Sequence, residues 1–321
     1  MYFRKILFIL SVFTIIISGC SNQEAKSNSD DQIKIGIMLS DVGLGDQSFS
    51  DSAFQGLTKA RDELGIVFDY RELESAGSYK EGLEELVKEE SDIVIGLGYM
   101  VQEDLEQVAE ENPEQQFVLI DAVSELDNIT SVSFDAMQGS YLAGVIAAIT
   151  TETDTIGFIG GEDNETINDF GDGFTAGAKS VTPDIEVDLE YANDFGNDEK
   201  GAEIADGMIE EGVDVLFAAA GFTGVGALQE AQRKSAYAIG VDSDQYYYAE
   251  KSVITSVLKK VDVAVFDLAK QLVDNGEIPT GHIRLGIAND GVGLAPVRVI
   301  ELSDQEKQLL DEAEAEFSEQ G

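Results

Sequence analysis

From Ile33 onward, short apolar runs alternate with longer stretches of mixed polarity. In the mixed stretches apolar residues recur three and four positions apart, as at Leu83, Leu86 and Val87, and this spacing predicts helices. The apolar runs are mostly continuous, which predicts strands buried on both faces of a parallel sheet covered by helices. The strands expected in the first part of the chain cover residues 33–39, 66–71, 92–98 and 117–121.

The same alternation of strand and helix restarts at Thr155. Near the C-terminus, residues 282–297 read as two short strands around an Asn-Asp-Gly turn, which predicts a hairpin, and a capped acidic helix follows from Ser303. The further expected strands cover 155–160, 185–191, 213–221, 237–244 and 253–260. The expected helices cover about 168–180, 196–212, 225–234 and 261–276.

These patterns predict an α/β protein with two lobes, each a parallel sheet flanked by helices, joined by a hinge and separated by a cleft. A chain of 321 residues is long enough for two domains of ordinary size. Late segments of the chain are expected to cross back between the lobes. The first lobe is expected to comprise residues 33–150 and about 252–278, and the second 151–251 and about 279–321.

The first residues have the pattern of an export signal. Arg4 and Lys5 precede an apolar stretch, 6–17, that is short for a membrane span, and the sequence Ser-Gly-Cys follows. Cys20 is the only cysteine, and its setting resembles a bacterial lipobox. We expect a signal peptide over 1–19, lipidation of Cys20, a polar tether over 20–32, and anchoring at the extracytoplasmic face of a bacterial cell membrane. The alternative is an uncleaved anchor with a chance cysteine.

The charge is strongly negative, with 63 acidic residues against 20 basic ones and a net charge of −43. This excess argues against nucleic acid and anionic membrane surfaces as charge-driven partners. It favours solubility, and it suggests a habitat of high salt or high pH in which surface acids are screened. Stability measured against NaCl concentration tests that hypothesis, which predicts a gain above low salt.

The loops after the strands carry the candidate chemistry, because ligands of open α/β sheets lie beyond the carboxyl ends of the strands. Acids follow several separate strands, aromatic residues lie near two expected helix starts, and a lysine ends another strand. Acids with a lysine suit sugar hydroxyls, and two aromatic faces suit a flat ring. The candidate ligand-binding residues are Asp41, Asp46, Ser48, Phe49, Asp121, Phe170, Gly221, Asp242 and Lys259.

Each candidate also has a purely structural interpretation. Asp46 and Ser48 could cap the helix that starts near Ser50, since Asp and Ser are preferred at that position. Phe49 and Phe170 could belong to the core. The glycine and the lysine could be an ordinary turn residue and a surface residue. It is the set taken together that indicates a binding site.

The first of these loops, Asp-Val-Gly-Leu-Gly-Asp-Gln-Ser-Phe-Ser from Asp41, resembles the opening loop of the basic membrane protein family, the PnrA-like nucleoside-binding lipoproteins. Similar motifs occur in order along nearly the whole chain after Cys20. They lie at 158–162, 172–179, 215–224, 237–245 and 255–265. The resemblance implies a substrate-binding protein of an ABC transporter with a two-lobed type I periplasmic-binding fold.

The resemblance also gives roles to individual positions. Phe49 is expected to stack on the base, with Phe170 as its partner from the other lobe. Asp121 is expected to hydrogen-bond the purine edge. Asp242 and Lys259 are expected to hold the ribose hydroxyls.

Two further positions and three departures from the family pattern complete this picture. Asp41 is expected to contact the ligand, and the backbone near Gly221 to approach it. The loop from Asp41 to Phe49 is one residue shorter than in the family pattern. Ser50 stands in place of the usual Asn, and Phe222 in place of a small residue.

The expected function is therefore that of a lipid-anchored, monomeric receptor that passes purine nucleosides to an ABC permease and its ATPase, without cofactor, metal or enzymatic activity. One alternative is a regulatory or surface role with altered or lost nucleoside binding. A nucleoside hydrolase is less favoured, because the acids lie in separate loops. In addition, His282 is the only histidine and falls in the predicted hairpin.

Overall fold

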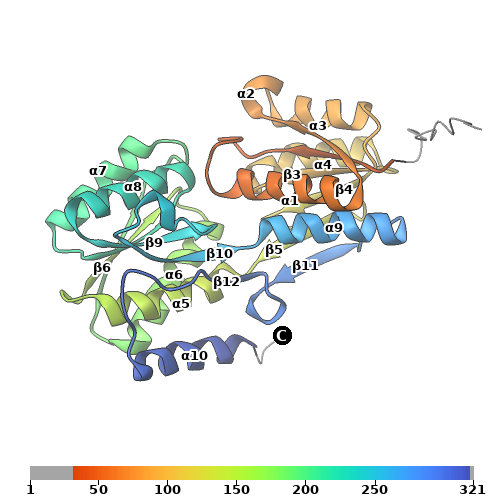
Figure 1. Cartoon of the computed structure of the whole chain (residues 1–321). Helices are drawn as coiled ribbons and strands as arrows, with labels where there is room; N and C mark the ends of the chain where they lie inside the picture. Colours follow the sequence, from red (N-terminus) through yellow and green to blue (C-terminus); the bar gives the residue numbers. More distant parts are fainter. Residues whose placement is uncertain (1–31, 319–321) are drawn as a thin grey trace, which may run out of the picture. The chain divides into compact units, whose positions relative to one another are not determined.

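The computed structural model describes residues 32–318 and contains two six-stranded sheets, each in its own lobe (Figure 1). The expected signal peptide and Cys20 lie outside the described residues. Across residues 32–318, no helix is both long enough and apolar enough to span a membrane. The alternation of continuous apolar strands and amphipathic helices is confirmed in both lobes.

Lobe 1 is built on a parallel sheet with the strand order β11-β5-β4-β3-β1-β2. Its strands are β1 (Lys34–Met38), β2 (Val67–Arg71), β3 (Ile93–Leu97), β4 (Gln116–Ile120), β5 (Ile129–Phe134) and β11 (Gly281–Leu285). One face carries α1 (Phe49–Leu64) and α9 (Val261–Asn275). The other carries α3 (Tyr79–Lys88) and α4 (Gln102–Glu111), with the short α2 (Leu73–Ala76) beside α3.

Lobe 2 repeats this architecture with the order β12-β10-β9-β8-β6-β7, in which only β12 is antiparallel to its neighbour. Its strands are β6 (Thr155–Gly160), β7 (Glu186–Tyr191), β8 (Val215–Ala219), β9 (Tyr237–Asp242), β10 (Val253–Lys259) and β12 (Val292–Leu294). One face carries α5 (Ala136–Thr150) and α6 (Glu165–Val181), and the other α7 (Asp198–Glu210) and α8 (Gly221–Lys234). The C-terminal helix α10 (Asp304–Ser318) packs on α5.

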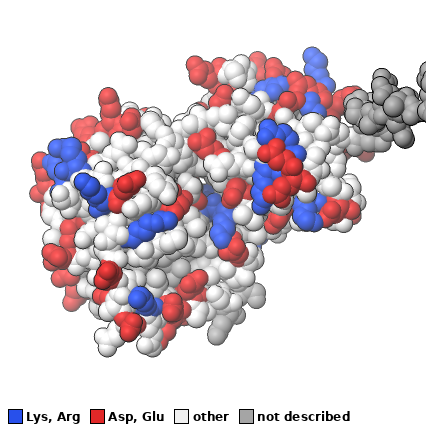
Figure 2. All heavy atoms as spheres, in the orientation of Figure 1, with Lys and Arg blue, Asp and Glu red and all other residues white. Residues whose placement is uncertain are grey.

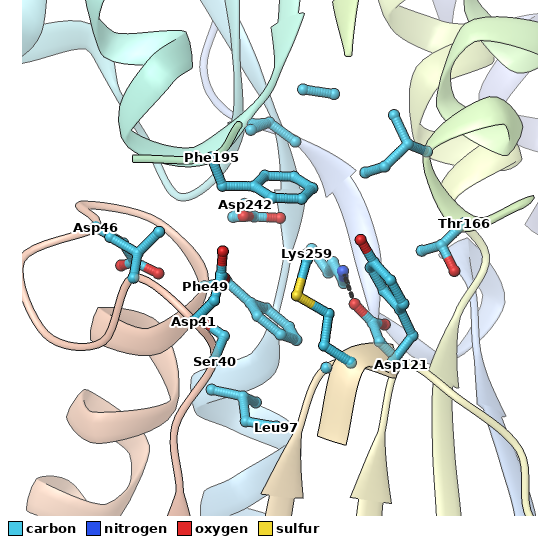
Figure 3. Close-up of a pocket in the computed structure, with 18 of the residues that line it drawn as sticks. Ser40, Asp41, Asp46, Phe49, Leu97, Asp121, Thr166, Phe195, Asp242 and Lys259 are labelled. Carbon is cyan, nitrogen blue, oxygen red and sulfur yellow. Dashed lines mark hydrogen bonds and ion pairs between the residues drawn. The ribbon is translucent and has the colours of Figure 1, made fainter. Parts of the chain in front are cut away.

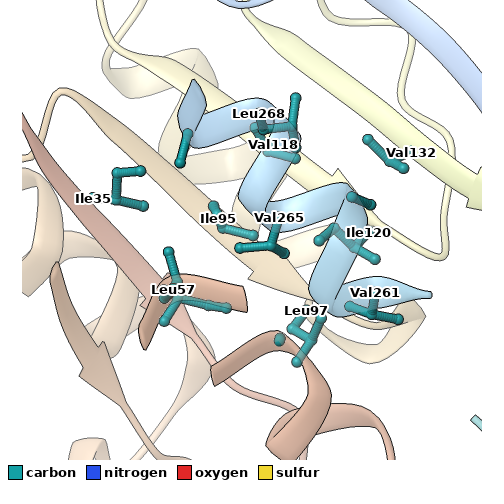
Figure 4. Packing of buried hydrophobic residues seen from close by; sticks show 14 of the residues in the cluster. Ile35, Leu57, Ile95, Leu97, Val118, Ile120, Val132, Val261, Val265 and Leu268 are labelled. Atoms are coloured by element: carbon teal, nitrogen blue, oxygen red, sulfur yellow. The ribbon is translucent and has the colours of Figure 1, made fainter. Parts of the chain in front are cut away.

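The core of lobe 1 shows why the strands are apolar along their whole length. Ile35, Ile95 and Val118 of the sheet pack against Leu57 of α1 and Val265 of α9, and all five are fully buried (Figure 4). Burial of each such side chain contributes about 1.5–3 kcal/mol. The opposite face of the same strands packs against α3 and α4. Because both faces are covered, polar residues are restricted to the strand ends and the loops.

The acidic excess lies on the surface of both lobes. Figure 2 shows acidic side chains over both lobes, interspersed with basic ones. Among the charged residues that the structure describes, Asp46, Glu230 and Lys259 are buried as whole residues, and the side chain of Asp121 is also nearly inaccessible. Three of these four, Asp46, Asp121 and Lys259, line the functional site described below, so burial of charge is concentrated there.

The chain passes between the lobes at Asp135, at Lys260 and through residues 286–291. Backbone hydrogen bonds link these crossings, from the Asp135 N–H to the Leu285 carbonyl at 2.7 Å and from the Lys260 N–H to the Gly291 carbonyl at 2.9 Å. The three crossings therefore form a connected hinge at one side of the sheets.

The strand membership differs from the division expected from the sequence. The expected first-lobe segment 252–278 contains β10, which pairs with β9 in lobe 2, and the expected second-lobe segment 279–321 contains β11, which pairs with β5 in lobe 1. Helix α5, expected in lobe 1, packs on α6, where Gly144 leaves room for the backbone at Phe174. The lobe to which a strand belongs depends on which sheet edge is free to pair with it. The periodicity of apolar residues contains no information about that pairing.

The hairpin expected over 282–297 is wrong. Both short strands exist, but β11 joins the sheet of lobe 1 and β12 the sheet of lobe 2. The Asn-Asp-Gly turn between them is the third crossing of the hinge, with Asp290 at φ 60° in the left-handed region. The local turn signal was correct, and the pairing inferred from it was not.

Candidate functional site

A hollow of about 700 Å³, the water at its mouth included, lies between the carboxyl ends of the two sheets. It is lined by loops that follow β1, β3, β4, β6, β8, β9 and β10 and by the loop after β7. Eight of the nine expected binding residues line it, and Ser48 does not. The eight are Asp41, Asp46, Phe49, Asp121, Phe170, Gly221, Asp242 and Lys259.

The loop before α1 is held by three carboxylates that accept backbone N–H groups. Asp46 accepts from Ser48 at 3.0 Å, from Ser50 at 2.6 Å and from Asp51 at 3.1 Å. Asp51 and Glu72 accept in the same way from residues 44, 45 and 47. Asp46 therefore caps α1, as its structural interpretation held, although it also lines the hollow. Its role is to fix the loop that places Phe49.

Burial raises the pKa of Asp46 to about 6, against an ordinary value of 3.8, although its three backbone hydrogen bonds oppose the rise. A raised folded-state pKa gives stability that is present at acid pH and is lost as the pH rises through 6. Between about pH 4 and 7, the unfolding free energy of the wild type relative to Asp46→Asn should fall by about 2 kcal/mol. Denaturant titrations of both proteins across this range measure the difference, and a constant difference would contradict the raised pKa.

Lys259 and Asp121 form a buried ion pair at the centre of the site (Figure 3). Lys259 ends β10 in lobe 2 and Asp121 follows β4 in lobe 1, so the pair joins the lobes. The two side chains are 7% and 8% exposed. The ammonium also lies 4.5 Å from the ring centroid of Phe49, within cation–π range. Three expected residues from three distant segments thus meet at one point.

Asp242 lies beside this pair and accepts a hydrogen bond from the hydroxyl of Ser48 across the lobes. Ser48 occupies the N-cap position of α1, but its side chain makes no capping hydrogen bond and does not line the hollow; it positions Asp242 instead. Protein atoms surround the Asp242 carboxylate on most sides, and this burial raises its pKa, whereas Lys259 and Ser48 favour the ionised form. Asp121 and Asp242 both adopt left-handed backbone conformations, at φ 67° and 63°, which turn their side chains out of the strand direction.

The aromatic walls differ in part from the expectation. Phe195 and Phe49 lie on either side of the hollow, one from each lobe (Figure 3). Phe170 also lines the hollow, but only 3% of its surface is exposed. It packs in the core, where its ring centroid lies 6.2 Å from that of Phe217. Phe195 was missed because no candidate residue was drawn from the loop after the edge strand β7, which was expected over 185–191. An aromatic residue within the polar stretch Ala-Asn-Asp-Phe-Gly-Asn was the available signal.

Acids from both lobes lie at or beside the hollow. The hydroxyl of Tyr99, in lobe 1, donates to the carboxylate of Glu162, in lobe 2. Asp41 is exposed as a residue, yet desolvation of its carboxylate by the surrounding protein atoms raises its pKa, and the nearby charges of Glu162 and Asp194 raise it further. Tyr99, which directly follows the strand expected over 92–98, was another residue that the sequence interpretation did not single out.

The departures from the family pattern have local explanations. The hydroxyl groups of Ser50 and Ser40 share a hydrogen bond, with 2.7 Å between their oxygens, and Ser40 lines the hollow. Gly221 lines it at φ 55° and starts α8, so this helix begins earlier than expected. Phe222 follows in the first turn and is not among the lining residues, so it does not narrow the hollow. The shortened loop still places Phe49 in the wall.

The geometry defines a class of protein. Two similar α/β lobes enclose a hollow with aromatic walls and charged groups at its centre, and a hinge of three crossings joins them. This is the architecture of a two-lobed ligand-binding protein, in which domain closure buries the ligand.

Comparison with known proteins gives the family. Residues 33–320 match the family described as ABC transporter substrate-binding protein PnrA-like. The chain is 36% identical to the CD4+ T-cell-stimulating antigen of Listeria innocua, with 91% of each chain covered. It is 34% identical to the ABC transporter nucleoside-binding protein BmpA of Lactococcus lactis, with 87% of each covered. This protein belongs to the PnrA-like family of ABC transporter substrate-binding proteins.

Solved structures agree with the fold. A solute-binding protein of an ABC transporter system from Aeropyrum pernix superposes with a TM-score of 0.82 at 26% identity, with 90% of this chain and 92% of that chain covered. The type I periplasmic-binding fold expected from the sequence is thereby confirmed. Membership of the family implies a ligand and membrane transporter partners, and proteins of this class are extracytoplasmic.

Proposed function

We propose that this protein is a lipid-anchored receptor that binds purine nucleosides between its lobes and delivers them to an ABC importer. The observation that carries the proposal is that aromatic rings and charged side chains meet at the centre of the hollow. Phe49 and Phe195 offer two aromatic faces to a flat base, and Asp242 with the Asp121–Lys259 pair offers charged partners for hydroxyl groups. The relative named as a nucleoside-binding protein supports the same ligand class.

Binding would be completed by closure of the lobes. Contacts across the hollow already include Ser48 with Asp242 and Tyr99 with Glu162. The side-chain amide of Gln245 adds a bond to the carbonyl of Gln47 at 3.3 Å. Closure excludes water, which strengthens hydrogen bonds between ligand hydroxyls and the carboxylates. The hinge crossings allow this motion without breaking either sheet.

Thermal melting of residues 21–321 tests the ligand class, after unfolding and refolding to remove any ligand carried through purification. Adenosine, guanosine and inosine should raise the melting temperature, and free ribose should not. A ligand at about 100 times its dissociation constant stabilises by about 2.7 kcal/mol. If no nucleoside shifts the melting temperature, the proposal fails and a regulatory or surface role becomes the better account.

The anchoring part of the proposal rests on the sequence around Cys20 alone. Lipidation of this residue would hold the receptor beside its permease. A Cys20→Ser variant that stayed in the membrane fraction would contradict the lipid anchor while leaving the ligand proposal untouched.

A further inference from the structure

The charges around the hollow are unbalanced. Five charged residues line it, and four of these are aspartates: Asp41, Asp46, Asp121 and Asp242. Lys259 is the one cation among the described lining residues, and its ammonium is already paired with Asp121. A ligand that enters this space therefore meets carboxylates without a free cation in the lining.

Acids beside the hollow add to this imbalance. We call Asp41, Glu162 and Asp194 the acidic rim. Glu162 accepts a hydrogen bond from the hydroxyl of Tyr99, which lines the hollow. Asp194 accepts from the N–H of Gly196 at 2.9 Å, next to Phe195 in the wall. Gly196 lies beside Val42, the neighbour of Asp41, so the rim draws acids from both lobes.

We propose that the acidic rim is a specificity device that excludes phosphorylated ligands, so that the receptor takes nucleosides and rejects nucleotides. This inference rests on the proposed nucleoside function. A phosphate monoester carries a charge between about −1.5 and −2 at neutral pH. Inside a partly dehydrated hollow the effective dielectric constant is lower than in water, so the repulsion between the phosphate and several carboxylates is stronger. Neutral hydroxyl groups incur no such repulsion and can donate to the same carboxylates.

This selectivity places the receptor in a reaction sequence. Where the extracellular source is a nucleotide, a phosphate-ester hydrolysis must come before capture. Water attacks phosphorus, the bond from phosphorus to the sugar oxygen breaks, and the oxygen takes a proton. The products are inorganic phosphate and the neutral nucleoside that this hollow accepts.

The neighbouring hollow offers the strongest competing site for a phosphate. It shares Tyr99, Asp121 and Thr166 with the main one and is also lined by His282 and Arg284. Arg284 is paired with Asp135 at 2.8 Å. Asp169 and Glu165 lie on the same lining. The competing site is therefore also acidic on balance, and we expect no phosphate capture there.

Calorimetry of the full chain in detergent with adenosine and adenosine 5′-monophosphate tests the proposal. Adenosine should bind at least about 100-fold more tightly, equivalent to about 2.7 kcal/mol. The ratio of the adenosine affinity to the monophosphate affinity should decrease when the salt concentration rises from about 0.01 M to about 1 M, because the Debye length falls from about 30 to 3 Å. Steric exclusion would leave the ratio unchanged by salt, and that result would overturn the electrostatic account.

A pair of variants locates the effect. Glu162→Gln with Asp194→Asn removes two rim charges without altering a residue that lines the hollow, and should lower the ratio about tenfold. The matched control, Glu152→Gln with Asp154→Asn, removes two exposed charges at the opposite end of β6 and should leave the ratio unchanged.

The remaining outcomes separate the two proposals. Equal affinity for both ligands would overturn the rim proposal but keep the nucleoside receptor. Monophosphate binding that Arg284→Gln abolishes would also overturn it and assign the phosphate to the neighbouring hollow. If neither ligand binds, the proposed function itself fails.

Discussion

Lys259→Met should lower the unfolding free energy by about 3–5 kcal/mol, because removing one partner of a buried pair leaves an uncompensated charge. Lys259 and Asp121 are nearly inaccessible, and Asp242 lies close enough for the same ammonium to favour its ionised form. Loss of the lysine therefore leaves two facing carboxylates. Asp121→Asn should cost less, since Lys259 keeps Asp242 as a partner. Urea titration of the ligand-free proteins measures both values.

The double variant Lys259→Met with Asp121→Asn sharpens this test. It removes both charges, so it should be more stable than Lys259→Met alone. The control is Lys270→Met, which breaks a pair with Asp274 whose side chains are about half exposed, at 51% and 52%. That change should leave the unfolding free energy unchanged within error. If Lys259→Met behaved like the control, the buried pair would have no role in holding the lobes together.

Phe49→Ala should weaken nucleoside binding about 10- to 100-fold, because stacking of a base on an aromatic ring contributes about 1–3 kcal/mol. Phe49 lies at the first position of α1, and its ring forms one wall of the hollow. The loop that places it is fixed by Asp46, Asp51 and Glu72 through backbone hydrogen bonds. Calorimetric titration with a purine nucleoside measures the loss.

The same helix provides a matched control for this loss. Phe54 packs edge-on against Phe68 and Tyr70, at 5.4 and 5.5 Å between ring centroids, and does not line the hollow. Phe54→Ala should lower stability but leave nucleoside affinity unchanged. Phe195→Ala should weaken binding to an extent similar to Phe49→Ala if the base lies between the two rings. If Phe195→Ala left the nucleoside affinity unchanged, Phe170 would be the better candidate for the second ring that stacks on the base.

Local sequence patterns predicted the α/β class and eight of the residues that line the hollow. Continuous apolar runs such as the one containing Ile93 and Ile95 can only be buried on both faces, so a parallel sheet with two helical layers follows from local pattern. In such sheets the ligand lies at the carboxyl ends of the strands, which is why Asp121, Asp242 and Lys259 could be selected from their positions along the chain. The family resemblance added the ligand class that we propose.

The role of each of these residues depends on tertiary contacts that local patterns do not report. Strand pairing is made by backbone groups that every residue carries, so the sequence could not show that β10 and β11 exchange lobes. Hydrogen-bond partners depend on distances between distant segments, and these made Asp46 a cap and Ser48 a support for Asp242. Phe195 joins the wall only because the folded sheet brings the end of its edge strand β7 to the hollow. Local pattern records how each segment is buried, whereas the site is an arrangement of segments that meet only when the lobes fold and close.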